Sequence, residues 1–303
     1  MEYFFLNNGE KIPAIGFGPG GLGYNPRPRK KTLIEKAYLK GMRVLHFHTF
    51  AERKYINTVA KAIQMGFRLI DFSESYGDGT LLKEAIRRSG VPREQLFITT
   101  RISNKSQINK TVRDDFLKQL KGLRTDYVDL LQFHWPVTGH YLDTWREMES
   151  FQQEGLCKMI GVANCNQHHL EDIFTICKIR PAVGQFEIHP LFTQKNLIKY
   201  YKEQGLQVEA YTALARHDDR LFTLPLLKNI GKKYNKTIAQ VILRWDIQNK
   251  CIPIVRSFNL GHIQELLDIF DFELSEEEVK LIDNININSR LRYDPDNCDF
   301  SVL

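Results

Sequence analysis

Four polar residues stand at the ends of apolar segments, where their side chains could do acid–base chemistry. Asp71 and Tyr76 follow one apolar run, Arg101 ends the next, and His134 ends a third. Together they offer a carboxylate, a phenol, a fixed cation and an imidazole. If the runs are strands of a barrel, these residues lie at the C-terminal strand ends, where barrel active sites are built. Each also has an ordinary explanation, since a strand-end Asp can cap a helix and a lone His is more often a core residue.

Short apolar runs alternate with amphipathic helical patterns along nearly the whole chain. Most runs are continuously apolar, which is typical of strands covered on both sides. Helical patterns, for example 114–123, 142–154 and 236–249, lie between them and predict βαβ units in a parallel sheet. The predicted strands are residues 12–18, 44–50, 68–72, 96–102, 128–134, 159–165, 182–188, 207–213 and 252–257.

A closed barrel and an open sheet both fit this alternation, and the glycine-rich segment 18–23 favours the barrel. It follows a strand, but Pro19 lacks an N–H and no helix opens directly behind it, so it does not form a dinucleotide-binding turn. Residues 3–6, a turn at 7–10 and residues 11–15 predict a hairpin. We therefore expect a (β/α)₈ TIM barrel with one end plugged by an N-terminal β-hairpin.

Nine strands are one more than this barrel needs, and an internal repeat suggests which is extra. The pattern from Lys36 to Phe47 recurs from Lys61 to Phe72, at an offset of 25 residues. Chance similarity between two amphipathic helix–strand units is the alternative explanation. We predict one domain, residues 1–303, with an insertion of about 22–57, whose helix–strand unit (about 31–50) lies outside the barrel.

Composition excludes several functional classes. The chain is 43% hydrophobic and 26% charged with a net charge of +6, ordinary values for a globular protein. No motif or charge block indicates a nucleic-acid partner, and no apolar stretch is long enough to span a membrane. The N-terminus lacks signal-peptide features, and the five cysteines form no CxxC pair. We expect a cytoplasmic protein with reduced thiols and no membrane or nucleic-acid partner.

In order and spacing, seven segments of the chain resemble the aldo-keto reductase family. They are residues 6–18, 66–71, 129–136, 160–164, 185–190, 239–245 and 271–275. The resemblance implies hydride transfer between NAD(P)H and a small-molecule carbonyl, with a catalytic Asp, Tyr, Lys and His. Asp71, Tyr76 and His134 match this tetrad. Tyr76 would be the general acid and His134 would orient the carbonyl.

The fourth member of the tetrad differs, because Arg101 stands where the family has Lys. Arg keeps the positive charge but is planar, longer and always ionised. We expect Arg101 to form an ion pair with Asp71, within reach of Tyr76, and to leave the phenol less acidic than a Lys would. Activity could then be retained, slowed, redirected or lost.

The cofactor residues that the resemblance implies match in part. Asn164 and Gln185 correspond to residues that hold the nicotinamide amide, although Ala163 replaces a helpful Ser. Tyr211 corresponds to the aromatic residue that stacks on the nicotinamide ring, and Thr212 to a phosphate-binding Ser. The adenosine loop is changed, and Leu266 replaces an Asn. NADP(H) is favoured over NAD(H), and the residues implied for this loop are Arg256, Ser257, His262 and Glu265.

Two other functions stay open. Arg101 is compatible with a protein that binds a nicotinamide cofactor without turnover and acts as a sensor or scaffold. The pair His46-x-His48 allows a metal-dependent hydrolase on the same barrel, but no Glu or Lys ligand is placed to complete a site, and we assign no metal. On the substrate side, Pro19-Gly20-Gly21 replaces the family's bulky aromatic residue and opens the pocket, which the insertion could refill.

Overall fold

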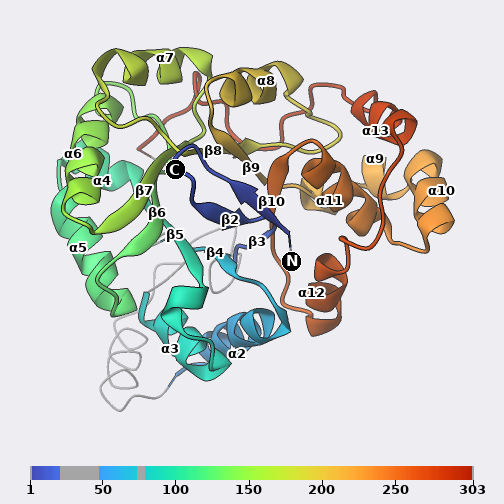
Figure 1. Cartoon of the computed structure of the whole chain (residues 1–303), viewed down its shortest axis with the longest axis horizontal. Helices are drawn as coiled ribbons and strands as arrows, with labels where there is room; N and C mark the ends of the chain where they lie inside the picture. Colours follow the sequence, from blue (N-terminus) through green and yellow to red (C-terminus); the bar gives the residue numbers. More distant parts are fainter. Residues whose placement is uncertain (1, 21–47, 74–78, 302–303) are drawn as a thin grey trace.

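Eight parallel strands close into a barrel (Figure 1) in the computed structural model, which describes residues 2–20, 48–73 and 79–301. In order around the barrel, β10 pairs with β3, and β4 to β9 follow until β9 meets β10 again. The strands are β3 (Gly16–Phe17), β4 (Leu69–Asp71), β5 (Phe97–Ile102), β6 (Val128–Phe133), β7 (Cys157–Ala163), β8 (Val183–Glu187), β9 (Gln207–Tyr211) and β10 (Cys251–Val255). The predicted (β/α)₈ barrel is confirmed.

Helices surround this barrel and cover its outer face (Figure 1). Several begin at residues that cap them: Thr49, Thr237 and Ser275 each form a capping box with the residue three positions later. The helices are α2 (Phe50–Met65), α3 (Gly79–Ser89), α4 (Asn104–Asn109), α5 (Val112–Leu123), α6 (Tyr141–Gln153), α7 (Gln167–Ile176), α8 (Lys195–Glu203), α9 (Asp219–Phe222), α10 (Pro225–Tyr234), α11 (Ile238–Gln248), α12 (Leu260–Leu267) and α13 (Glu276–Asp283). Within the described ranges, no helix combines the length and apolar character needed to cross a membrane.

The N-terminal hairpin closes the end of the barrel where the strands begin. Strands β1 (Tyr3–Phe5) and β2 (Lys11–Pro13) pair antiparallel, and Gly9 takes a positive φ of 85° in the turn between them. Leu6 and Ile12 pack with the first inward residues of the barrel strands, such as Leu69 and Leu130. The predicted hairpin plug is therefore confirmed, and the opposite end of the barrel remains available for a site.

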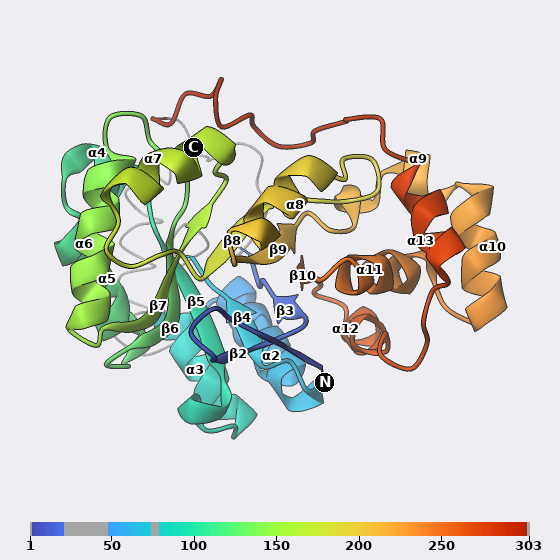
Figure 2. The ribbon, with the colours of Figure 1, turned by 45° about the horizontal axis from the view of Figure 1, so that its top comes forward.

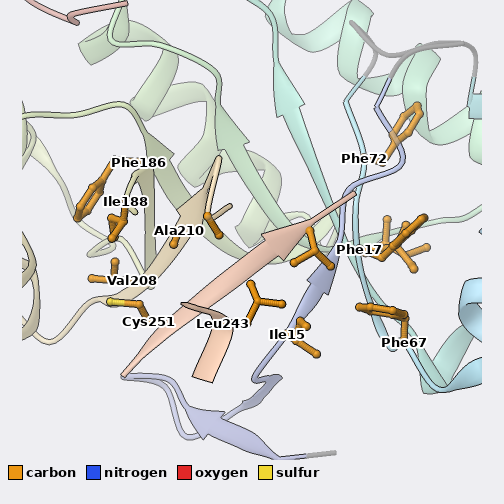
Figure 3. Close-up of a cluster of buried hydrophobic side chains, with 14 of the residues drawn as sticks. Ile15, Phe17, Phe67, Phe72, Phe186, Ile188, Val208, Ala210, Leu243 and Cys251 are labelled. Carbon is orange, nitrogen blue, oxygen red and sulfur yellow. The ribbon is translucent and has the colours of Figure 1, made fainter. Parts of the chain in front are cut away.

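The main core lies between the strands and the surrounding helices. Figure 3 shows Phe17 and Phe67 together near β3, while Val208, Ala210 and Cys251 lie beside the neighbouring strands β9 and β10. These side chains point outward from the barrel, so the alternate residues of each strand point inward. Both faces of the strands are buried, which explains why their sequences are continuously apolar.

The predicted insertion after β3 falls largely outside the described residues. Residues 21–47 are not among the described residues. The repeat at Lys36–Phe47 and most of the extra predicted strand, 44–50, therefore lie outside them. At its end, Phe50 begins helix α2, and Tyr55 and Ile56 are buried in the core. Residues 50–57 thus belong to the first barrel helix, because Thr49 provides its N-cap. Strand β3 pairs directly with β4, which closes the barrel without a ninth strand.

Asp246 predicts how stability depends on pH. This side chain on α11 is fully buried, and neither carboxylate oxygen has a hydrogen-bond partner among the described residues. Burial raises its pKa well above the ordinary value. The native protein therefore holds a proton that the unfolded chain releases, and the resulting stability, complete below about pH 4, is lost as pH rises. We expect Asp246→Asn to stabilise the protein by about 2 kcal/mol at pH 8 and little at pH 4, measured by urea unfolding. Equal effects at both pH values would contradict this explanation.

Candidate active site

A buried ion pair lies near the C-terminal ends of strands β4 and β5. The Nη1 atom of Arg101 is 2.6 Å from Oδ1 of Asp71, and both side chains are almost completely buried. The register explains the contact, because Asp71 pairs with Thr99 on β5, two residues before Arg101. The ion pair that the sequence predicted is therefore present. Tyr76, its predicted neighbour, lies outside the described residues.

Hydrogen bonds extend this pair across the inside of the barrel. Arg101 donates from Nη2 to Oε1 of Gln185 at 2.7 Å. Gln185 in turn donates from Nε2 to Oε2 of Glu209 at 2.8 Å, and Gln132 donates to the same oxygen at 3.4 Å. Five side chains from strands β4, β5, β6, β8 and β9 thus form one buried polar network. In the apolar interior of a barrel, such a network fixes its members in position because every lost contact is costly.

Glu209 is the unexpected member of this network. Its side chain is completely buried. Burial, followed by repulsion from the charge of Asp71, raises its pKa to about 7, and hydrogen bonds from Gln185 and Gln132 together with the charge of Arg101 oppose the shift. The network therefore contains one fixed cation, one paired carboxylate and one carboxyl group that changes charge near neutral pH.

His134 follows β6 and faces the cavity at the same end of the barrel. Burial lowers its pKa to about 3, with smaller contributions from the charges of Arg101 and Arg292. The imidazole is therefore neutral near pH 7 and can donate one N–H and accept at its other nitrogen. Its backbone carbonyl accepts a hydrogen bond from Nδ2 of Asn164 at 2.8 Å, which links β6 to the end of β7.

One cavity of about 410 Å³ brings together many of the predicted site residues. It opens at the C-terminal ends of the strands, and its volume falls in the range of small-molecule sites. Its walls come from the ends of β3, β4, β6, β7, β8, β9 and β10 and from the C-terminal segment. The predicted residues that line it are Asp71, His134, Asn164, Gln185, Tyr211, Thr212 and Arg256.

The amide groups predicted to hold a nicotinamide already have protein partners. Oδ1 of Asn164 accepts a hydrogen bond from the hydroxyl of Tyr211 at 2.6 Å, while Gln185 bridges Arg101 and Glu209. These contacts hold Tyr211 and both amides at the cavity wall. Thr212 follows Tyr211 with a positive φ of 56°, and Ala215, Arg216 and His217 also have positive φ values. Strained backbone of this kind is common at ligand-binding sites.

The residues predicted to bind the adenosine part lie at and beyond the cavity rim. Arg256 is exposed and crosses close to Gly20, where a Cβ atom would come within 2.6 Å of the guanidinium. Ser257 accepts a hydrogen bond from the N–H of Asn259. Further along, His262 is exposed on α12, whereas Glu265 accepts a hydrogen bond from the hydroxyl of Thr237 at 2.6 Å. Only Arg256 of these four lines the cavity.

Comparison with known proteins identifies this arrangement. A model of the aldo/keto reductase family matches residues 40–287. The chain belongs to the aldo-keto reductase family. Among curated relatives, the uncharacterized oxidoreductase YtbE of Bacillus subtilis is 42% identical over 249 residues, which are 81% of this chain and 88% of the relative. Glyoxal reductase of Bacillus subtilis is also 42% identical, covering 79% of this chain and 86% of the relative.

Solved structures of aldo-keto reductases have the same fold. An enzyme from a deep-sea metagenome library superposes with a TM-score of 0.83 at 32% identity, over 98% of this chain and 99% of that chain. A Bombyx mori aldo-keto reductase in complex with NADP gives 0.81 at 28% identity, over 97% of this chain and 96% of that chain. Family membership and relatives named as reductases support a carbonyl oxidoreductase acting on small molecules with a nicotinamide cofactor.

The C-terminal segment of this aldo-keto reductase covers one side of the cavity. Figure 2 shows it in red, running from α13 across the molecule towards α7. Tyr293 and Phe300 place their rings 6.5 and 6.4 Å from that of Trp135, the residue after His134. Arg292 on this segment lines the cavity. Arg292 and Glu209 were not predicted from the sequence, although the polar Glu209 within an apolar strand marks an inward-facing position.

A separate cluster of His168, His169 and Asp296 has the side chains of a metal site, but its hydrogen bonds argue against one. Nε2 of His168 is 3.2 Å from Asp296, and none of the three residues lines the cavity. Nδ1 of His169 accepts the N–H of Asn166 at 3.1 Å, so the proton of the neutral ring is on Nε2, the nitrogen that faces Asp296. A metal would need the lone pair of that nitrogen. The cluster instead ties the C-terminal segment to α7.

The metal-dependent hydrolase considered from the sequence rested on His46-x-His48, and His46 lies outside the described residues.

Proposed function

We propose that this protein transfers a hydride between NADP(H) and an aldehyde or ketone. The observation that carries the proposal is the cavity at the C-terminal strand ends that Asp71, neutral His134 and the Asn164–Tyr211 pair line together, with Arg101 paired to Asp71 in the wall behind it. Barrel enzymes build their active sites at this end.

The residues of the cavity fit nicotinamide adenine dinucleotide phosphate, NADP(H). Tyr211 offers an aromatic face, Asn164 and Gln185 offer amides, and Arg256 offers a guanidinium at the rim. NADP(H), when bound, supplies the hydride for the carbonyl carbon. Arg256 and Ser257 would hold the 2′-phosphate, Thr212 another phosphate, and His262 and Glu265 the adenosine side.

The protein's own residues then supply orientation and a proton. His134 stays neutral near pH 7 and can donate its N–H to the carbonyl oxygen, which polarises the bond. We assign proton donation to Tyr76, a phenol whose ordinary pKa is about 10 and which therefore needs a nearby cation to act near neutral pH. Arg101 is the cation, and Asp71 competes for it through the 2.6 Å ion pair.

The proposal is tested by following NADPH absorbance with a panel of aldehydes. The panel includes glyoxal and methylglyoxal, for which two relatives are named. We expect carbonyl-dependent oxidation of NADPH, slow on simple aldehydes because of Arg101. Tight NADPH binding without turnover of any carbonyl would favour the non-catalytic alternative, and absence of binding would contradict the whole assignment.

Arg256 makes a prediction about cofactor preference. Because a guanidinium binds phosphate through a charge-assisted, two-pronged contact, Arg256→Ala should weaken NADPH binding about 10- to 100-fold. NADH, which lacks the 2′-phosphate, should bind as before. Titration of protein fluorescence with each cofactor measures both affinities, and Arg146→Ala, an exposed change on α6, is the matched control. An equal loss for the two cofactors would show that Arg256 does not contact the 2′-phosphate.

A further inference from the structure

The charged side chains around the cavity are strongly unbalanced. Three arginines, Arg216, Arg256 and Arg292, line it. Among the described residues that form its walls, the acidic side chain is Asp71, and that carboxylate is already paired with Arg101. A concave site lined by one sign of charge concentrates its field and attracts ligands of the opposite sign. The cavity is therefore built for anionic ligands.

The three arginines lie on two different sides. Arg216 and Arg256 follow strands β9 and β10, on the side of Thr212 and Ser257, to which we assign the cofactor phosphates. Arg292 belongs to the C-terminal segment, whose neighbouring Tyr293 packs against Trp135 beside His134. Its charge also helps to lower the pKa of His134, after burial and the charge of Arg101. Arg292 thus lies on the side where His134 would meet a carbonyl compound.

The backbone of Arg292 is held in place by a buried carboxylate. Glu187, at the end of β8, is completely buried and accepts the N–H groups of Leu291 at 2.7 Å and Arg292 at 3.0 Å. The same carboxylate contacts Nε2 of His189 at 3.0 Å. Two backbone contacts across about a hundred residues fix the point at which Arg292 enters the cavity. A positioning contact of this kind is expected where a side chain must meet a ligand.

Within the described residues, no carboxylate forms an ion pair with the Arg292 guanidinium. Its described neighbour is the ring of Tyr293, whose centroid is 5.7 Å from the guanidinium carbon. The side chain is half-buried, so it retains part of its water. A planar guanidinium in this state is suited to a carboxylate, which it can bind through two parallel hydrogen bonds.

We propose that Arg292 binds a carboxylate of the substrate, so that the preferred carbonyl compounds are aldehydes that carry a carboxylate group. This inference rests on the proposed carbonyl reduction and adds the substrate class to it. The aldehyde group would lie at His134, while the carboxylate lies against the C-terminal segment. Specificity would come from the charge, because the neighbouring lining residue Trp135 presents a mainly apolar side chain.

Two aldehydes of similar size and different charge test the proposal: 4-carboxybenzaldehyde and its methyl ester, methyl 4-formylbenzoate. With the native protein, we expect the anionic aldehyde to have a KM at least about 10-fold lower. Arg292→Leu should raise that KM about 10- to 100-fold, with little change in kcat or in the constants for the ester. Arg292→Lys should recover part of the loss, and added salt should weaken the preference of the native protein.

Arg290→Leu is the matched control. Arg290 lies two residues earlier on the same segment, stacks on Phe192 at 4.7 Å and does not line the cavity. Its replacement removes the same charge from the segment but not from the cavity. Both KM values should therefore stay unchanged. Thermal unfolding of both variants checks that the segment remains folded. The proposal is overturned if Arg292→Leu affects both aldehydes equally or if Arg290→Leu has the same effect.

A binding experiment separates this proposal from failure of the proposed function. The probe is 4-(hydroxymethyl)benzoate, compared with its methyl ester by calorimetry, with and without NADP⁺. If no aldehyde is reduced but the anion binds the native protein at least about 10-fold more tightly than Arg292→Leu, the carboxylate site stands and the reductase activity does not. If aldehydes are reduced but neither assay shows a preference for the anion, the reductase stands and the carboxylate site is wrong.

Discussion

Replacing Arg101 by Lys is expected to raise kcat on simple aldehydes about 10- to 100-fold, which is part of the range that general acid catalysis contributes. Arg101 directs its guanidinium to Asp71 at 2.6 Å and to Gln185 at 2.7 Å. These contacts direct the guanidinium towards Asp71 and Gln185. A Lys ammonium is a compact charge that cannot satisfy both partners in this way. More of its field would reach the phenol of Tyr76, which would lower the pKa of that phenol and favour proton transfer.

The measurement is kcat at several pH values with saturating NADPH. The rate advantage of Arg101→Lys should be accompanied by a shift of the pH profile to lower pH. A positive charge whose field reaches the phenol more fully lowers the pKa of that phenol further. Arg93→Lys is the matched control, since Arg93 also pairs with a buried carboxylate, Asp129 at 2.8 Å, but not in the cavity. If Arg101→Lys abolishes an activity that the native protein has, Arg101 is a functional adaptation and our account of the four residues is wrong.

The strands could be predicted because their physical requirements are local. Each barrel strand is buried on both faces, so its sequence is a short apolar run that needs no knowledge of its neighbours. The ion pair of Asp71 with Arg101 was also predictable, because residues that end consecutive parallel strands are brought to one edge. The strand predicted at 12–18 was too long. There, Pro13 ends β2 and the chain turns from the hairpin into β3 at Gly16.

The polar network and Arg292 depend on contacts that the sequence does not show. Glu209 lies beside Gln185 because β8 pairs with β9, and it meets Gln132 of β6 across the barrel interior, so its partners lie 24 and 77 residues away. Arg292 follows the last helix in a segment without regular periodicity. Its position is set by Glu187, 105 residues earlier in the chain. A sequence pattern can mark such residues as unusual, but only the folded chain supplies their partners.

The final prediction concerns Glu209, whose carboxyl group should make stability depend on pH near neutrality. Burial and the charge of Asp71 raise its pKa to about 7, whereas the same group in an unfolded chain has a pKa near 4.3. The native protein therefore keeps a proton that the unfolded chain releases. The corresponding stability is complete below about pH 4 and is lost as pH rises towards 7. Above pH 7, ionisation of buried Glu209 lowers the stability by about 4 kcal/mol.

Glu209→Gln should remove this dependence, because an amide has nearly the same shape and no charge. Its oxygen can still accept the hydrogen bonds that Gln185 and Gln132 now donate to Glu209. We expect the variant to be about 4 kcal/mol more stable than the native protein at pH 8 and about equally stable at pH 4, as measured by urea unfolding across that range. Glu171→Gln, an exposed change on α7, is the control. If Glu209→Gln instead destabilises the protein at pH 8, Glu209 acts as an ionised partner of Arg101, because removal of one buried charge then leaves the other less compensated.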